Sequence, residues 1–367
     1  GEWKCTTIGN IGDIKNGPFG SVLHAEDYVE NGIPIVTTEH FKTGLMPSDK
    51  FGIPQVSNED YIRLKGYRLE TNDIVFSRVG SVDINAHVGI EQNGWLFSGR
   101  VLRVRPKYDI DSLFLHYALS TEAVKRDIRN RAVGQTMPSI NTPILSSTTI
   151  QLPKDLFEQK KVAHFLRLLD ERIITQNKII EKLQSLIKGL RVCCMQRVYG
   201  NNVYLSEIAQ IYQPQTISST ELTEDGFLVY GANGIIGKYK DYNHETEQIC
   251  ITCRGNTCGM VNYTKPMSWI TGNAMVINTD KYQDKVCKRY LYHYLSAYNF
   301  NSIISGSGQP QIVRTPLEKL KITLPTISEQ KQKAIIFDKI QDKIDINHKV
   351  LNLYIGQKQY LLRQMFI

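Results

Sequence analysis

Cysteines at close spacing are the first side chains in this sequence that could do chemistry, because thiolates can hold a zinc ion. Cys250 and Cys253 form a Cys-x-x-Cys pair, and Cys258 and Cys287 are the nearest further thiols. A structural zinc site needs four ligands in tetrahedral geometry. The run 249–253 alternates like a strand, however, which places Cys250 and Cys253 on opposite faces. We therefore predict seven free cysteines in a reducing compartment and no metal site.

The motifs of three reactions on DNA are missing. An adenine methyltransferase would need an Asn-Pro-Pro-aromatic motif, and the chain has no Pro-Pro pair. The phosphate-binding sequence Gly-x4-Gly-Lys-Ser/Thr does not occur. The acidic and basic residues of Glu318-Lys-Leu-Lys321 have no acidic companion of the kind a nuclease needs. His87, His116 and His293 have no partners at catalytic or ligand spacing and are predicted to be structural or surface residues. The sequence predicts no catalytic residue and no cofactor in this chain.

Polar and cationic side chains beside glycines form a second group, which suits hydrogen bonding to nucleic acid. Arg78-Val-Gly-Ser81 ends a predicted strand, and Arg254-Gly-Asn-Thr257 stands at the parallel place later in the chain. Arg100 and Asn273 each follow a glycine. Arginine favours guanine and asparagine favours adenine, so this pair could let two halves read different bases; the alternative for Arg100 is a surface salt bridge. The predicted DNA-binding residues are Arg78, Ser81, Arg100, Gln135, Thr136, Ser139, Lys238, Arg254, Asn256, Thr257, Asn273, Ser307 and Gln309.

The elements that must position these side chains occur twice. Residues 158–195 and 329–366 align without a gap, 171 positions apart, with apolar residues at alternating steps of three and four. This is the a/d pattern of a coiled-coil seam. Gln176 and Asn347 are polar seam positions at the same place in both copies, and Lys358 can extend its ammonium group to water from the seam. The predicted seam residues are Leu166, Leu169, Ile173, Gln176, Ile180, Leu183, Ile187, Leu190, Phe337, Ile340, Ile344, Asn347, Leu351, Tyr354 and Leu361.

Both long helices are predicted to begin with the same signals. Asp155-Leu-Phe-Glu158 and Thr326-Ile-Ser-Glu329 have the spacing of a capping box. Just upstream, Ile150-Gln-Leu-Pro153 and Ile322-Thr-Leu-Pro325 are short strands that end at a proline. Two unrelated amphipathic helices would not share strand, proline, cap and heptads. We therefore predict that the chain is a tandem repeat of one structural unit.

Each copy is predicted to be an α/β (α+β) globular region followed by a helix of about 40 residues, which is ~60 Å long. A helix with one apolar seam needs a partner, and the other helix is the economical one. An antiparallel pair is favoured, which would place Gln184 near Phe337. The predicted domains are 1–153 and 201–325, both globular, and 154–200 and 326–367, the two helices.

Composition agrees with a soluble protein that has a polyanionic partner. The chain is 41% hydrophobic and 22% charged, and its formal net charge is +8. Such a charge is also common among proteins that bind no nucleic acid. No apolar run approaches the roughly 20 residues of a membrane helix, and no signal peptide opens the sequence. A cytoplasmic location without a membrane partner is expected.

The repeated motifs carry a family resemblance over nearly the whole chain. They are Gln135-Thr-Met-Pro-Ser-Ile-Asn141, Ile150–Pro153, Glu158-Gln159 and Asp170 in the first copy, and Ser307-Gly-Gln-Pro-Gln-Ile312, Ile322–Pro325 and Glu329-Gln330 in the second. In this tandem order they resemble the specificity subunits of type I restriction–modification systems. The second copy departs from the pattern at Val313 and Arg314, where the first has Asn141 and Thr142.

The resemblance implies a non-catalytic subunit with two target-recognition domains separated by an antiparallel two-helix coiled coil. It implies that the chain reads a split, asymmetric sequence in double-stranded DNA with an unread spacer. The partners would be two methyltransferase subunits, which use S-adenosylmethionine, and optionally nuclease/translocase subunits. Two alternatives remain open, namely a system whose partner subunit fuses methyltransferase and nuclease, and a coiled-coil adaptor that binds proteins only.

Overall fold

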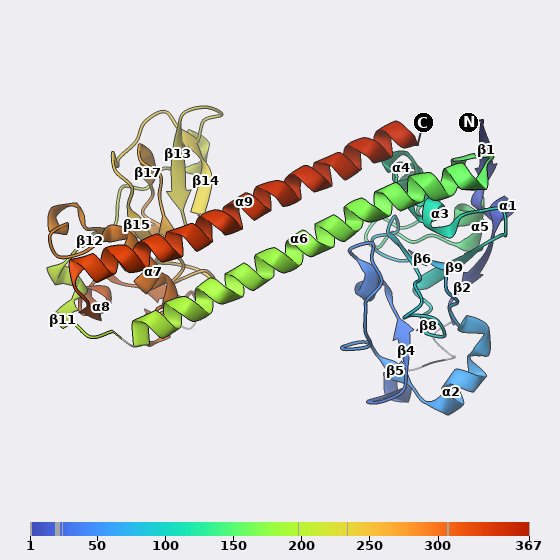
Figure 1. Cartoon of the computed structure of the whole chain (residues 1–367), viewed down its shortest axis with the longest axis horizontal. Coiled ribbons are helices and arrows are strands. Elements are labelled where there is room, and N and C mark those ends of the chain that lie inside the picture. The colour runs from blue at the N-terminus through green and yellow to red at the C-terminus, as the bar shows by residue number, and fades with distance from the viewer. Residues whose placement is uncertain are drawn as a thin grey trace. The chain divides into compact units, whose positions relative to one another are not determined.

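The computed structural model describes residues 2–18, 23, 25–196, 198–232, 234–306 and 308–366 (Figure 1). The chain divides into two compact units, Gly1–Thr175 with Leu351–Ile367, and Gln176–Val350. Each unit holds one globular region and a part of both long helices, α6 (Leu156–Gln196) and α9 (Ile327–Met365). In the described parts of the chain, neither these helices nor the shorter ones are apolar enough over enough length to cross a membrane.

The globular region of the first unit combines short strands with short helices. Its strands are β1 (Trp3–Thr7), β2 (Gly12–Asn16), β3 (Tyr28–Val29), β4 (Ile33–Val36), β5 (Gln55–Val56), β6 (Ile74–Ser77), β7 (Asn85–His87), β8 (Leu96–Phe97), β9 (Val101–Pro106) and β10 (Thr149–Pro153). Its helices are α1 (Ile8–Ile11), α2 (Asn58–Arg63), α3 (Ser112–Leu119), α4 (Glu122–Arg131) and α5 (Thr142–Ser146), with 3-10 turns η1 (Ala25–Asp27), η2 (Thr38–Phe41) and η3 (Lys65–Tyr67). The main sheet is antiparallel in the order β2-β9-β6-β7, a smaller sheet has the order β3-β5-β4-β8 with β4 and β8 parallel, and β1 pairs with β10.

The second unit repeats this plan with fewer elements. Its strands are β11 (Asn201–Tyr204), β12 (Gln210–Tyr212), β13 (Phe227–Gly231), β14 (Gly234–Tyr239), β15 (Ile249–Thr252), β16 (Val261–Tyr263), β17 (Ser268–Ile270), β18 (Ala274–Asn278), β19 (Ile304–Ser305), β20 (Gln311–Ile312) and β21 (Lys321–Leu324). Its helices are α7 (Lys288–Ala297) and α8 (Arg314–Glu318), with 3-10 turns η4 (Leu205–Glu207), η5 (Ser219–Glu221), η6 (Asp280–Tyr282) and η7 (Phe300–Ser302). The main sheet β12-β18-β15-β16, the parallel pair β13–β17 and the pair β11–β21 match their counterparts in the first unit. The predicted duplication is therefore present in the strand order.

The central strands are covered on both faces, which explains their continuous apolar sequences. In β6, Ile74 and Phe76 belong to the core beneath α3, whereas Val75 belongs to a separate cluster on the opposite face. In the second unit Cys253 packs in the main core and Cys250 in the cluster of the other face. The prediction that these two thiols point to opposite faces is confirmed.

A buried glutamine fixes each long helix to its globular region, and we call this contact the glutamine clamp. Gln159 Oε1 accepts a hydrogen bond from the N–H of Asp111 (2.9 Å), the N-cap residue of α3, and its Nε2 donates to the carbonyl of Pro153 (3.0 Å). Gln330 makes the same pair of bonds with Cys287 N–H (2.8 Å) and the Pro325 carbonyl (2.9 Å). The two glutamines are 0% and 1% exposed, respectively. One side chain thus ties the strand before the long helix to the short helix beside it.

The caps lie where the sequence places them, with one difference between the copies. Thr326 and Glu329 form the reciprocal box, in which the hydroxyl accepts from Glu329 N–H (3.3 Å) and the carboxylate from Thr326 N–H (3.2 Å). In the first copy the Asp155 carboxylate instead accepts from Phe157 N–H (2.9 Å). Each contact satisfies a backbone donor at the helix start.

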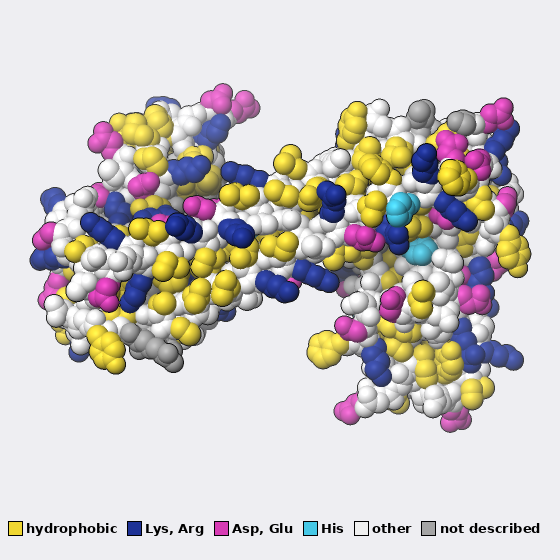
Figure 2. All heavy atoms as spheres, in the orientation of Figure 1, with side chains coloured by type: hydrophobic (Ala, Val, Ile, Leu, Met, Phe, Trp, Pro, Cys, Tyr) yellow, Lys and Arg dark blue, Asp and Glu magenta, His cyan; other side chains and the backbone are white. Residues whose placement is uncertain are grey.

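The two long helices run antiparallel, as predicted. In the second unit Gln176 Nε2 donates to both the side-chain oxygen and the carbonyl of Asn347, and Ile187 packs against Phe337. In the first unit Asp170 of α6 meets Lys358 of α9. Every predicted seam residue is buried or half-buried, and the exposed sides of both helices carry hydrophobic side chains among lysines and arginines (Figure 2).

Lys358 is the one seam position whose surroundings differ from the prediction. Its ammonium group does not simply reach to water but bonds to Asp170 Oδ1 at 2.5 Å and lies 5.3 Å from the centre of the Tyr117 ring. The Tyr117 hydroxyl donates to the other oxygen of Asp170 (2.7 Å). A charge in an apolar seam is stabilised by such a partner.

The glutamine clamp makes a testable prediction. Replacing Gln159 by Leu leaves the Asp111 N–H and the Pro153 carbonyl buried without their partner, which should lower the free energy of unfolding by about 2–4 kcal/mol. Urea titration followed by circular dichroism measures the loss. The neighbouring Lys160→Leu, at an exposed position, is the control, and equal effects of both substitutions would contradict the clamp.

The polar seam pair makes a second prediction. Asn347→Leu removes the partner of the buried Gln176 carboxamide and should destabilise the fold by about 1–3 kcal/mol. The double variant Gln176→Leu/Asn347→Leu restores an apolar seam and should be at least as stable as the parent. Thermal unfolding of both variants tests this, and a double variant weaker than the single one would refute it.

Candidate nucleic-acid interface

Three loops of the first globular region meet at the end of β6 through backbone hydrogen bonds. Arg78 N–H donates to the Arg100 carbonyl (2.9 Å), and Gly80 N–H donates to the Pro138 carbonyl (2.8 Å). The carbonyl of Arg78 accepts from Ile140 N–H (2.9 Å). The structure thus brings the predicted residues of positions 78–81, 100 and 135–139 together, although they lie far apart in sequence.

The side chains of this first loop cluster have two different roles. Ser81, Arg100, Gln135 and Thr136 are exposed. Arg78 is half-buried, and its Nη1 donates to the carbonyl of Gly99 (3.1 Å), which holds the neighbouring loop. Ser139 likewise bonds to the carbonyl of Val133 (3.3 Å). The exposed four are free to approach a ligand, while Arg78 and Ser139 brace the backbone.

The second globular region has the same three-loop arrangement at the end of β15. Cys253 N–H donates to the Asn273 carbonyl (3.2 Å), Gly255 N–H to the Pro310 carbonyl (2.9 Å), and Ile312 N–H to the Cys253 carbonyl (3.0 Å). These bonds gather the predicted residues of the second half. Arg254, Asn256, Asn273 and Gln309 are exposed and Thr257 is half-buried; Ser307 lies outside the described residues.

These bonds correct one detail of the sequence alignment. Val79 forms a bridge with Ser139, and Arg254 forms the matching bridge with Gln311. Arg254 is therefore the counterpart of Val79, and Arg78 is the counterpart of Cys253, so pairing the two arginines was wrong by one position. Adjacent strand positions point to opposite sides, which explains why Arg78 is half-buried and Arg254 is exposed. The pairing of Arg100 with Asn273 agrees with the bonds.

A glycine with positive φ shapes the turn in both clusters. Gly80 has φ +84° and Gly255, its counterpart, has φ +85°. This left-handed conformation is open to glycine at little cost and lets the loop return directly to its neighbour. The shared turn explains why Gly-containing sequences follow both strands.

Lys238 is not part of either cluster in the contacts that the structure describes. It lies on β14, which belongs to the sheet β14-β13-β17, and its ammonium group is 3.4 Å from Asp225 Oδ1. The neighbouring Tyr239 packs edge-on against Trp269.

A small cleft beside Arg100 was not predicted from the sequence. It measures about 480 Å³ and is lined by Tyr28, Thr37, Thr38 and Ser98 as well as Arg100. Hydroxyl-bearing residues from three separate segments line one space there, and hydroxyls can donate to and accept from phosphate or base edges. No spacing rule could have found these residues, because they lie on η2, β3 and the loop after β8.

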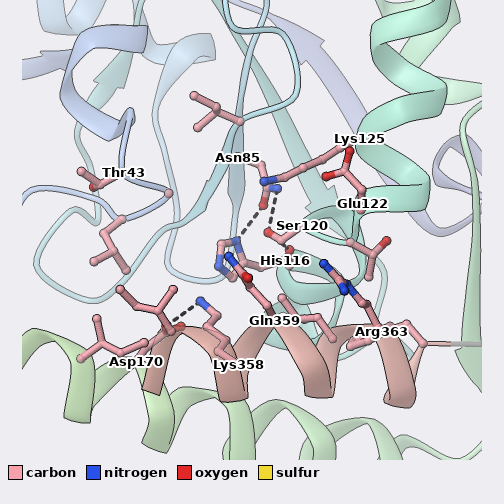
Figure 3. A pocket seen from close by; sticks show the side chains of 18 of the residues that line it. Thr43, Asn85, His116, Ser120, Glu122, Lys125, Asp170, Lys358, Gln359 and Arg363 are labelled. Carbon is pink, nitrogen blue, oxygen red and sulfur yellow. Dashed lines mark hydrogen bonds and ion pairs between the residues drawn. The ribbon is translucent and has the colours of Figure 1, made fainter. Parts of the chain in front are cut away.

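Two histidines without predicted partners are buried in polar networks. The Nδ1 atom of His116 is 2.7 Å from Asn85 Oδ1 (Figure 3), and burial, with the nearby His87, Lys358 and Lys125, lowers the pKa of His116 to about 3. His293 lies between Arg191, 2.8 Å from its Nδ1, and Asp338, 2.8 Å from its Nε2. Burial lowers the pKa of His293. Both histidines serve the junction of globular region and helices, so their predicted structural role agrees with the contacts.

In the described part of the chain there is no group of three or more histidine, cysteine or acidic side chains that could hold a metal ion. Burial raises the pKa of the Cys250 thiol to about 12. This thiol therefore stays protonated at neutral pH, and a protonated thiol is not a metal ligand or a nucleophile.

The low pKa of His116 makes stability depend on pH. The unfolded chain binds a proton near pH 6.5 and the folded chain only near pH 3, so stability is complete above about pH 6.5 and is lost as the pH falls below it. The loss should be about 1.4 kcal/mol per pH unit. His116→Gln should flatten the slope of unfolding free energy between pH 6 and 4.5, whereas His164→Gln, at an exposed position, should not; equal slopes for the two would contradict the assignment.

One family model matches this chain twice, once in each half. The model of the type I restriction modification DNA specificity domain matches residues 1–185 and again residues 201–353. The chain is 25% identical to the type I restriction enzyme MjaVIII specificity subunit of Methanocaldococcus jannaschii over 402 residues, which cover 95% of this chain and 88% of the relative. It is 31% identical over 147 residues to the type I restriction enzyme EcoprrI specificity subunit of Escherichia coli, which covers 39% of this chain and 36% of that one.

A solved structure has the same fold. The S subunit of a type I restriction–modification system from M. genitalium superposes with a TM-score of 0.70 at 18% identity, covering 100% of this chain and 96% of that one.

Proposed function

Since the chain belongs to the type I restriction–modification DNA specificity family, we propose that it is the DNA-recognition subunit of such a complex, and that each globular region reads one part of a split target. The observation that carries this proposal is the duplicated loop cluster. Its backbone bonds and its glycine turn are the same in both halves, whereas its exposed side chains differ. Base contacts specify a sequence and phosphate contacts position the protein, so a common frame with different side chains suits two different half-sites.

The residues that would contact DNA are the exposed members of the two clusters. In the first half these are Ser81, Arg100, Gln135 and Thr136, beside the cleft lined by Thr37 and Thr38. In the second half they are Arg254, Asn256, Asn273 and Gln309. Arginine can bond bidentately to guanine, and asparagine or glutamine to adenine.

Methyltransferase subunits would dock on the long helices. Large apolar side chains at the heptad positions beside the seam are exposed, namely Ile179 (38%), Leu186 (50%), Ile336 (55%) and Ile346 (58%) in the second unit. In the first unit Phe165, Leu168, Leu353 and Tyr360 of the same two helices are also 42–72% exposed. We call these residues the apolar stripe. Exposed apolar surface of this kind marks a protein-binding face, and S-adenosylmethionine would be bound by the partners rather than by this chain.

Arg254 is the sharpest test of base reading. Arg254→Ala should weaken DNA binding of the assembled complex by about 1–3 kcal/mol and relax the preference at one base pair. Arg254→Lys keeps the charge but loses the planar fork, so it should relax the preference with a smaller loss of affinity. Competition binding with single-base target variants measures both quantities. Unchanged affinity and preference in both variants would remove Arg254 from the interface.

The helix pair offers a second test of a split target. One heptad inserted at equivalent points of α6 and α9 adds about 10 Å, which corresponds to about three base pairs of unread spacer. Sequencing of methylated adenines in a host that carries the altered chain and its partner should show both half-sites unchanged and the spacer longer. An altered half-site would contradict the separation of reading from spacing.

DNA binding itself separates this function from that of a protein-only adaptor. The assembled complex should bind its duplex with an affinity that falls steeply as salt rises, because lysines and arginines displace counterions from phosphates. Binding that is absent under every partner condition would favour the adaptor.

A further inference from the structure

The hairpin β13–β14 of the second unit ends beside the loop cluster of the second half. Its two strands pair antiparallel as far as Gly231 and Gly234, so the turn between them is short (Figure 1). β17 runs parallel to β13 and ends opposite Tyr230. The loop that carries Asn273 starts at this point, because Thr271 N–H donates to the Tyr230 carbonyl (2.9 Å). The tip of the hairpin is therefore a neighbour of residues that would read DNA.

A second contact joins the hairpin turn to the end of β15. The Thr252 hydroxyl donates to the Ala232 carbonyl. Thr252 is the last residue of β15 and stands two positions before Arg254. The turn also approaches β16, since a Cβ atom on Gly234 would be 3.8 Å from Asn262 Oδ1. The hairpin is thus fixed to the strand that presents the exposed arginine of the cluster.

A β-bulge lies in this hairpin, next to its turn. The register of β13 with β14 shifts by one residue between Val229 and Tyr230, which leaves Ile236 as the extra residue. Successive side chains of a regular strand point to opposite faces, whereas a bulge changes the direction in which a side chain points. Both isoleucines beside the turn are exposed, Ile235 by 54% and Ile236 by 46%. We call these two residues the apolar tip.

Gly231 leaves room for the apolar tip. A Cβ atom on Gly231 would be 3.0 Å from Cγ2 and 3.1 Å from Cδ1 of Ile236. The Ile236 side chain therefore lies against the backbone of the opposite strand. A side chain that is already supported in this way loses little conformational entropy when it contacts a ligand.

The first half has threonines at the equivalent place. Ser98 N–H donates to the Val36 carbonyl (2.9 Å), which is the same bond that starts the matching loop in the second half. Thr37 and Thr38 come next in the sequence and line the cleft beside Arg100. The same place beside the loop cluster is therefore polar in the first half and apolar in the second, as surfaces that read different bases require.

The apolar group that a base edge offers to such a tip is the 5-methyl group of thymine, which faces the major groove. The major groove is about 12 Å wide and admits a two-stranded β-ribbon, whereas the minor groove is only about 6 Å wide. Because β17 ends opposite Tyr230, the hairpin extends past it as a ribbon of two strands. The shape of the hairpin end and its apolar side chains thus suit the same groove.

We propose that the apolar tip enters the major groove of the second half-site and contacts thymine 5-methyl groups, a proposal that rests on the function given above. Ile235 and Ile236 cover the methyl groups, while Arg254 and Asn273 bond to neighbouring base edges. Continuity with the loop cluster supports DNA as the partner. A protein partner fits less well, because a stable protein interface buries about 800 Å² on each side, and two isoleucines beside polar loops offer only a small apolar surface.

Uracil in place of thymine tests the contact, because uracil lacks only the methyl group. After the target has been mapped from its methylated adenines, each thymine of both half-sites is replaced in turn, and competition binding of the assembled complex is measured. The parent should lose about threefold to fivefold in affinity at one or two positions. These positions should all lie in one half-site. A parent complex that binds every uracil target as tightly as the thymine target would overturn the proposal.

The double variant Ile235→Ser/Ile236→Ser assigns the effect to the apolar tip. It should bind the thymine target as weakly as the parent binds the uracil target, and uracil should cause no further loss. The control Ile62→Ser changes an isoleucine of α2 that is 67% exposed and should keep the parent's preference for thymine. Thermal unfolding shows whether both variants are folded. A preference for thymine that persists in the double variant, or an equal loss of affinity for thymine and uracil targets, would refute the contact.

Failure of this inference and failure of the proposed function give different results. A complex that binds a split target but does not distinguish thymine from uracil leaves the proposed function standing and removes only the role of the apolar tip. A parent complex that binds no DNA removes both.

Discussion

A buried carboxamide that must satisfy both of its ends determines where each long helix begins. Gln159 and Gln330 are shielded from water, so an unpaired amide or carbonyl there would cost a large fraction of the stability of a domain. Each side chain meets the requirement by bonding one backbone group before the long helix and one at the start of a short helix. This explains why a glutamine stands at the same place in both copies, as the fourth residue of each long helix, where the helix contacts its globular region.

The loops of each cluster are also held in place by hydrogen bonds, but here the bonds join backbone atoms. The bonds that join the three loops run between main-chain N–H and carbonyl groups, so they do not depend on which side chains stand at those positions. Arg100 and Asn273 can differ without disturbing the frame that presents them. Only the glycine turns and the bracing contacts of residues such as Arg78 restrict the sequence. The recognition residues can vary while the fold stays the same, because side-chain atoms would contact the target and backbone atoms of the same residues hold the loops together.

Local patterns predicted much of this structure. Heptad spacing, proline and caps are short-range signals, and they predicted both long helices and the duplication. The antiparallel pairing was predicted from the order of the elements, because the second globular region lies between the two helices in the sequence. The correct alignment of the two halves at Arg78 could not be obtained this way, because Arg78 and Arg254 both follow similar strands and align with each other by identity. The true counterparts, Val79 and Arg254, are defined by their bridges to a loop about 60 residues further along the chain. Lys358 illustrates the same limit. Its partner Asp170 lies 188 positions away in sequence, and no periodicity links them.

The antiparallel pairing has a consequence for how the halves can vary. Tyr117 and His293 occupy equivalent positions, and each bonds to an aspartate on the long helix that follows its own half. The cation that completes each network comes from the other helix, Lys358 in the first unit and Arg191 in the second. The polar network between one globular region and the long helices therefore depends on residues from both repeats. Exposed loop residues can change singly, but a change at Tyr117 or His293 requires matching changes in a helix that belongs to the other repeat, so the junctions constrain the chain more tightly than the surfaces that read the target.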